Sequence, residues 1–133
     1  MSGISPKLPL YTDPVDGIAL NKTLKQMTRQ NLKMIILTSP GERIMHPKFG
    51  VGLRRYLFMN NTQRTLSDMS RKIEQQVRTY LPSVSIRSIK FLSENGDEIR
   101  SSFESSSSSN YVKLVIDYEI PSAFVSDTLD IKV

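Results

Sequence analysis

The acidic side chains that could support hydrolysis are poorly placed for it. Glycoside hydrolysis needs two carboxyl groups roughly 5–9 Å apart, one of them with a raised pKa. Glu42 is the only acid in its loop, and the adjacent Arg43 would lower the pKa of its carboxyl group. Asp68 and Glu74 lie six residues apart on a predicted helix, where their side chains do not converge. We therefore predict no enzyme activity, and expect Glu42 to form an ion pair or to cap a turn.

Other kinds of reactive site also lack their ligands or nucleophiles. The chain has one histidine, His46, and no cysteine, which is too few ligands for a zinc site. No Gly-x-Ser-x-Gly motif is present, and Gly50-x-Gly52 lacks the Lys-Ser/Thr pair of a phosphate-binding loop. We predict no cofactor and no metal, and infer that the function is binding.

The loop that carries Glu42 and Arg43 spans residues 40–53. Pro40-Gly41 is strong turn punctuation at its start, and apolar runs flank the loop on both sides. Glycines at positions 50 and 52 indicate positive φ angles, or a second backbone that approaches too closely for a Cβ atom. The pattern predicts either a salt-bridged corner of the fold or a docking surface.

Two helices are expected to position this loop. The first spans residues 19–38, capped by Asn21 or Thr23, and the second begins at an N-cap Thr65 and ends before Pro82. Their apolar faces are predicted from spacings of three and four residues. These faces comprise Leu20, Leu24, Met27, Asn31 and Ile35, widened by Leu32 and Ile36, and then Leu66, Met69, Ile73, Val77, Tyr80 and Leu81.

The last third of the chain alternates with the period of a β-strand. Strands are predicted at residues 84–92, 111–120 and 128–133, and the phase slips between Ile86 and Ile89, which indicates a bulge or a twist. The acidic, serine-rich residues 94–110 are expected to be a mobile insertion.

The predicted fold class is α+β, with an N-terminal arm and two to three helices packed on a small C-terminal sheet of about three strands. We expect one domain over residues 1–133, with an extended, proline-rich arm (1–17), a helical part (18–82) and a sheet part (83–133). The final strand carries one lysine and no proline. It is therefore either an ordinary short edge strand or an edge that accepts a strand from a partner.

The charge is unevenly distributed along the sequence. Residues 1–90 hold 15 Lys/Arg against 5 Asp/Glu, and residues 91–133 hold 3 against 8. This asymmetry is either solvated surface or a means of attracting two partners. A nucleic-acid-binding module is the alternative function from another class, although the glycine-aromatic strand signature is missing. Its binding residues would be Lys22, Lys25, Arg29, Arg71, Lys72 and Arg78.

The loop sequence resembles the baseplate-wedge family of contractile phage tails, also called sheath initiators and sometimes labelled tail lysozyme-like. Baseplate subunits of type VI secretion systems share the pattern. A peptidoglycan-degrading enzyme is a weaker alternative suggested by that label. The resemblance rests on Gly41-Glu42-Arg43, Pro47, Phe49-Gly50, Gly52-Leu53 and Leu57-Phe58.

This resemblance implies partners and site residues. Wedge-core proteins and the tail sheath protein are the expected partners, tail tube or hub proteins are further candidates, and neither a membrane nor nucleic acid is expected. The expected location is the virion tail baseplate, assembled in the host cytoplasm. Glu42 and Arg43 would contact the wedge core, with Pro47, Phe49, Gly50 and Gly52 shaping the loop. The sheath strand would add to Leu129, Asp130, Ile131, Lys132 and Val133.

Overall fold

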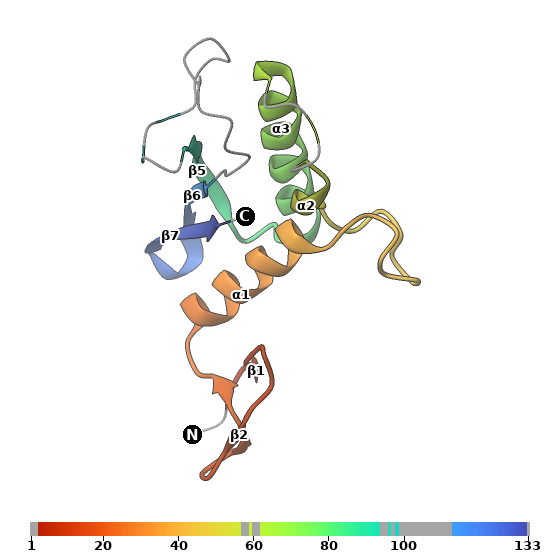
Figure 1. Cartoon of the computed structure of the whole chain (residues 1–133). Helices are drawn as coiled ribbons and strands as arrows, with labels where there is room; N and C mark the ends of the chain where they lie inside the picture. The colour runs from red at the N-terminus through yellow and green to blue at the C-terminus, as the bar shows by residue number, and fades with distance from the viewer. Residues whose placement is uncertain are drawn as a thin grey trace.

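A computed structural model describes residues 3–56, 59, 62–93, 96, 98 and 113–132. Apart from Gly96 and Glu98, the insertion predicted at residues 94–110 lies outside the described residues, as do Leu57, Phe58 and Val133. Within the described residues, helices cover one face of a three-stranded sheet and a hairpin extends from the first helix (Figure 1). The predicted α+β class is confirmed.

The sheet contains β5 (Ser85–Leu92), β6 (Lys113–Ile120) and β7 (Val125–Lys132), in the order β5-β6-β7 with antiparallel neighbours. The last strand begins at Val125, before the predicted residue 128. It starts earlier because the short 3₁₀ turn η1 (Pro121–Ala123) brings Val125 directly opposite Ile120.

The predicted slip in β5 is a bulge. Ile86 pairs with Tyr118 and Ser88 pairs with Asp117, so Arg87 is the extra residue on β5. Because one residue is inserted, Ile86 and Ile89 point to the same face although three positions separate them.

The first helix, α1 (Leu24–Leu37), starts later than predicted. Thr23 is its N-cap and accepts a hydrogen bond from the Gln26 N–H, whereas Leu20 and Asn21 belong to a strand. The predicted face is right at Leu32, Ile35 and Ile36, which are buried, but Leu24 is 39% exposed. The buried stripe of α1 also includes Thr28.

The long helix α3 (Gln63–Tyr80) has the predicted face but a different cap. Leu66, Met69, Ile73 and Val77 are buried. The cap is Thr62, whose backbone is extended and whose side-chain Oγ1 accepts a hydrogen bond from the Thr65 N–H, so Thr65 lies inside the first turn. Between the helices lies the one-turn α2 (Leu53–Tyr56).

The expected arm is folded back on itself. Together with residues 18–21 it forms the N-terminal hairpin, in which β1 (Ser5–Pro6) pairs with β4 (Leu20–Asn21) and β2 (Thr12–Asp13) pairs with β3 (Gly17–Ile18). These residues project beyond the N-terminal end of α1 (Figure 1). The Asn21 amide donates to Gln30 Oε1 (3.1 Å) and the Gln30 amide donates to the Pro6 carbonyl (3.0 Å), which fixes the hairpin to α1.

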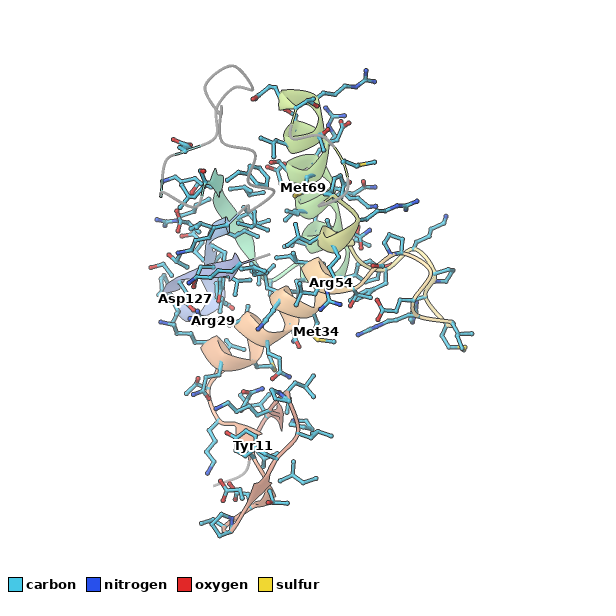
Figure 2. The ribbon with its side chains drawn as sticks, in the orientation of Figure 1. Tyr11, Arg29, Met34, Arg54, Met69 and Asp127 are labelled. Atoms are coloured by element: carbon cyan, nitrogen blue, oxygen red, sulfur yellow. The ribbon has the colours of Figure 1, made fainter. Side chains whose placement is uncertain are left out.

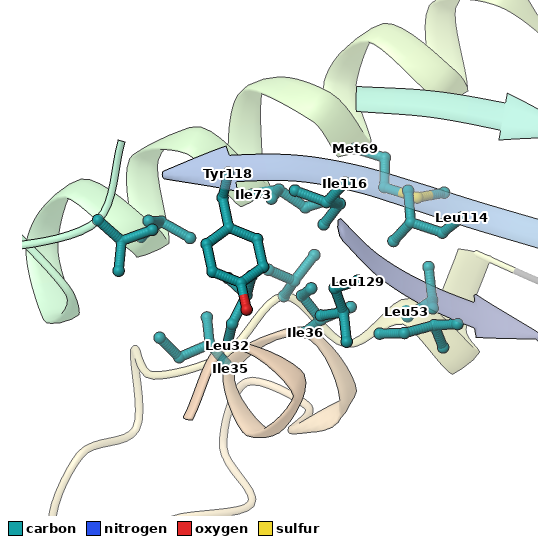
Figure 3. Close-up of a cluster of buried hydrophobic side chains, with 14 of the residues drawn as sticks. Leu32, Ile35, Ile36, Leu53, Met69, Ile73, Leu114, Ile116, Tyr118 and Leu129 are labelled. Carbon is teal, nitrogen blue, oxygen red and sulfur yellow. The ribbon is translucent and has the colours of Figure 1, made fainter. Parts of the chain in front are cut away.

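The core lies between the helices and one face of the sheet. Tyr118 on β6 is 1% exposed, and its hydroxyl donates to Asp127 Oδ2 (3.1 Å). Burial raises the pKa of Tyr118, and the neighbouring Asp127 carboxylate raises it further. Figure 3 shows how the strands and helices interdigitate at Leu32, Ile35, Ile36, Leu53, Met69, Ile73, Leu114, Ile116, Tyr118 and Leu129.

The opposite face of the sheet is polar and is linked across all three strands by Asp117. Its carboxylate accepts hydrogen bonds from the hydroxyls of Ser88 (2.7 Å) and Thr128 (2.8 Å). These two hydrogen bonds hold the pKa of Asp117 below its ordinary value of 3.8. The charged carboxylate therefore stabilises the folded sheet.

Asp117→Asn is expected to lower the free energy of unfolding at pH 7. It should also make the free energy of unfolding depend less on pH in the acidic range. A carboxyl group with a lowered folded-state pKa stabilises above the unfolded pKa, and that contribution disappears as the pH falls through the lowered value. The asparagine NH₂ cannot accept the second hydroxyl hydrogen bond, which costs roughly 1 kcal/mol. Urea unfolding at pH 7 and pH 2 checks this prediction. A difference between variant and wild type that is as large at pH 2 would contradict it.

Candidate functional site

The central loop is a closed structure that projects from the end of α1. The Gly41 N–H donates to the Pro47 carbonyl (2.8 Å), which closes the neck, and the Phe49 N–H donates to the His46 carbonyl (3.0 Å). Ile44 and Met45, at the tip, are 93% and 85% exposed. The chain thus presents two large apolar side chains on a hydrogen-bonded support, and Figure 1 shows this loop projecting away from the helices.

Gly50 and Gly52 have the backbone properties predicted for them. Their φ angles are +102° and +72°, and a Cβ atom built on Gly50 would lie 2.1 Å from the Thr38 carbonyl oxygen. The same carbonyl accepts a hydrogen bond from the Gly52 N–H (2.9 Å), and the Val51 N–H donates to the Ile35 carbonyl (2.9 Å). The segment in which the chain returns from the loop is therefore joined to the last turn of α1.

Glu42 acts as a capping group within the loop. Its Oε2 accepts a hydrogen bond from the Ser39 N–H (2.9 Å), and its own N–H donates to the Ser39 carbonyl (3.1 Å). The side chain remains exposed. One carboxylate oxygen thus stabilises the turn that follows α1, while the group as a whole stays accessible to a partner.

Arg43 lies on an aromatic ring. Its guanidinium carbon is 4.0 Å from the centroid of the Phe49 ring, which also packs edge-on against Tyr80 with centroids 4.8 Å apart. Phe49 is 7% exposed, so the arginine forms a lid on a buried side chain. The positive charge is held at the surface of the loop in a fixed place.

Gln76 on α3 was missed by the sequence analysis. Its Oε1 accepts from the Gly50 N–H (2.9 Å), and its Nε2 donates to the Lys48 carbonyl (3.1 Å). The side chain thus pairs with the loop backbone as a neighbouring strand would. The available signal was its place beside Val77 on the apolar face, where a polar residue needs partners.

β7 is an edge strand in the part of the chain that the structure describes. It pairs with β6 alone, and no other described backbone group hydrogen-bonds to it. Of the residues predicted to receive a sheath strand, Leu129 and Ile131 are 2% and 5% exposed and belong to the core, while Asp130 and Lys132 are exposed. Val133 lies outside the described residues.

The side chain of Arg29 crosses the outer edge of β7. It contacts Asp127 (3.7 Å) and Asp130 (3.5 Å), and Lys25 also contacts Asp127 (3.3 Å). Asp127 and Asp130 are an odd number of residues apart, so their side chains lie on opposite faces of the strand. With β6 on the other side, one guanidinium reaches both only around the outer edge, and Figure 2 shows Arg29 and Asp127 next to each other.

The predicted charge asymmetry is partly neutralised within the fold. Lys25 and Arg29, from the basic part of the sequence, pair with the aspartates of β7. Lys22 pairs with Asp16 (2.8 Å) and Arg71 with Asp68 (3.7 Å). Four of the six residues proposed for nucleic-acid binding therefore face carboxylates, which weakens that alternative.

The described residues contain no group of three or more His, Cys, Asp or Glu side chains that could hold a metal ion. None of the described helices combines the length and hydrophobicity required to cross a membrane.

The chain was compared with known protein families and with solved structures, and both comparisons found similar proteins. The family described as baseplate wedge protein gp25 matches residues 22–123. A Geobacter sulfurreducens protein, described provisionally as a tail lysozyme, is similar with a TM-score of 0.64 at 18% identity over 86% of this chain and 94% of that one. A chain of the anti-feeding prophage baseplate gives 0.66 at 21%, covering 85% and 81%. None of the curated protein sequences matches the chain.

Proposed function

Because the chain belongs to the baseplate wedge protein gp25 family, we propose that it is a structural, non-enzymatic subunit in the baseplate of a contractile phage tail or related injection machine. In this proposal the central loop docks on wedge-core subunits, and the outer edge of β7 receives a strand from the first ring of tail sheath subunits. Assembly takes place in the host cytoplasm, and the tail tube or hub lies within reach of the docked subunit.

The observation that carries the proposal is the unpaired edge of β7 among the described residues. An edge strand offers a row of N–H and C=O groups that an extended segment can pair with. Arg29 and Asp130 are both 46% exposed, and exposed ion pairs of this kind contribute only about 0–1 kcal/mol, while Asp127 keeps its contact with Lys25. An incoming strand can therefore displace the Arg29 side chain at little cost, and until then Arg29 opposes accidental pairing between free subunits.

The central loop suits a contact that must be rigid. Its neck, its glycines and Gln76 fix the backbone before binding, so little conformational entropy remains to be lost. Ile44 and Met45 would enter an apolar pocket of the wedge core, with the Glu42 and Arg43 charges beside them. Figure 1 shows this loop and the turn between β6 and β7 on opposite sides of the molecule, which allows both partners to bind at once.

Glu42→Gln tests the wedge-core contact. Glutamine keeps an oxygen that accepts the Ser39 hydrogen bond, so the loop should stay folded while the negative charge is lost. A charge-assisted contact with the wedge core is worth about 1.5 kcal/mol, so we expect affinity for isolated wedge-core subunits to fall roughly tenfold. Binding is measured by titration, and incorporation by mass spectrometry of purified baseplates.

Two further variants distinguish the effect of the loop's charges on binding from the effect of its shape. Glu42→Ala removes the charge and the cap together, and Arg43→Lys keeps the positive charge but loses the planar stacking on Phe49. Normal binding and incorporation of Glu42→Gln, Glu42→Ala and Arg43→Lys would contradict the docking role of this loop. Unaltered thermal midpoints for Glu42→Gln and Arg43→Lys would establish that any loss arises at the interface.

A further inference from the structure

Phe124 combines two unfavourable features that the chain itself does not offset. Its side chain is 98% exposed, and its backbone is in the left-handed region, with φ 51° and ψ 34°. Glycine, asparagine and aspartate are the residues that adopt this conformation readily. A buried aromatic side chain could compensate for such strain by packing, but Phe124 gains almost no burial. An aromatic residue at this place is explained by contact with another molecule.

We propose that Phe124 is an anchor for the sheath subunit, inserted into an apolar pocket next to the strand that this subunit adds to β7. The inference rests on the proposed function and names a second contact of the same interface. Tyrosine, tryptophan and phenylalanine supply a large contact area with few rotatable bonds, and a small number of such residues dominates most interfaces.

The position of Phe124 favours the sheath subunit, and not the wedge core, as the partner that it contacts. Phe124 directly precedes Val125, the first residue of β7, and the 3₁₀ turn before it closes with a hydrogen bond from the Phe124 N–H to the Pro121 carbonyl (3.4 Å). A strand that pairs with the full length of β7 reaches this end of the sheet whether it runs parallel or antiparallel to β7. The central loop lies on the other side of the molecule (Figure 1).

The decisive variant is Phe124→Gly, since stability and assembly should respond differently. Glycine adopts the left-handed conformation without strain, so the thermal midpoint of the free chain should stay the same or rise. Baseplates built with the variant should start sheath polymerisation roughly thirtyfold less often than wild type, counted by electron microscopy with purified sheath protein. Phe124→Trp should restore it. Val15→Gly, at an 83% exposed apolar side chain in the N-terminal hairpin, is the matched control and should have no effect.

Thr128→Pro, which obstructs the β7 edge itself, distinguishes failure of this inference from failure of the proposed function. If Thr128→Pro prevents sheath growth and Phe124→Gly does not, the anchor is overturned and strand addition stands. If neither variant affects growth, both are overturned. If Phe124→Gly is missing from baseplates, the residue docks on the wedge core and the sheath anchor is wrong. Loss of sheath growth from fully incorporated Phe124→Gly supports the inference.

Discussion

Gly50→Ala is expected to destabilise the isolated chain by about 3 kcal/mol or more, within a total stability on the order of 5–15 kcal/mol. Two separate effects contribute. The φ angle of +102° is unfavourable for any residue with a Cβ atom, and that atom would lie 2.1 Å from the Thr38 carbonyl oxygen. To relieve the clash, the chain must move away from α1 and stretch the hydrogen bond between the Gly52 N–H and the same carbonyl. Thermal and urea unfolding measure the loss.

Gly17→Ala is the matched control, because Gly17 also has a positive φ (+78°) but no atom within 4 Å of a built Cβ. It should lose only the conformational part, about 1–2 kcal/mol. If the two variants unfold at the same midpoint, the close approach of Gly50 to the end of α1 has no energetic importance. The rigid support proposed for the loop tip would then lose its basis.

The parts of the fold that follow a local rule could be predicted from sequence. The face of α3 depends on a spacing that is repeated over its whole length, and the bulge at Arg87 follows because Ile86 and Ile89 must both reach one core. The need for glycine at position 50 was also visible, since two glycines around one valine rarely occur without a backbone reason. In each case the signal lies within a few neighbouring residues.

The features that the sequence analysis got wrong or missed depend on contacts between segments that are distant in the sequence. Leu20 fits a helical face, but it pairs with the proline-rich arm and so ends up in a strand. Thr62 and Thr65 are equally good caps by type, and the extended backbone of Thr62 in the folded chain makes it the cap. Gln76 and Arg29 act on a loop and a strand far away in sequence. Propensity cannot anticipate such side-chain bonds, because their partners are brought together by the tertiary fold.

Thr128→Pro is expected to abolish sheath growth from baseplates while leaving the chain folded. Every second N–H group of an edge strand points away from its neighbour, and this prediction takes the Thr128 N–H as one of those on the outer edge of β7. A proline at this position removes one donor from the outer edge, and its ring obstructs an approaching strand. An obstruction of about 3 kcal/mol corresponds to roughly a hundredfold fewer sheathed particles, counted by electron microscopy.

Thr128→Ala isolates the backbone effect. Alanine loses the hydroxyl hydrogen bond to Asp117, as proline does, but keeps the N–H group. Sheath growth should therefore be normal with alanine and absent with proline, at equal incorporation of both variants into baseplates. This pair is a cleaner test than removal of the last strand, because Leu129 and Ile131 are core residues and their deletion would unfold the domain. Sheath growth at the wild-type level on Thr128→Pro particles would mean that the edge of β7 receives no strand.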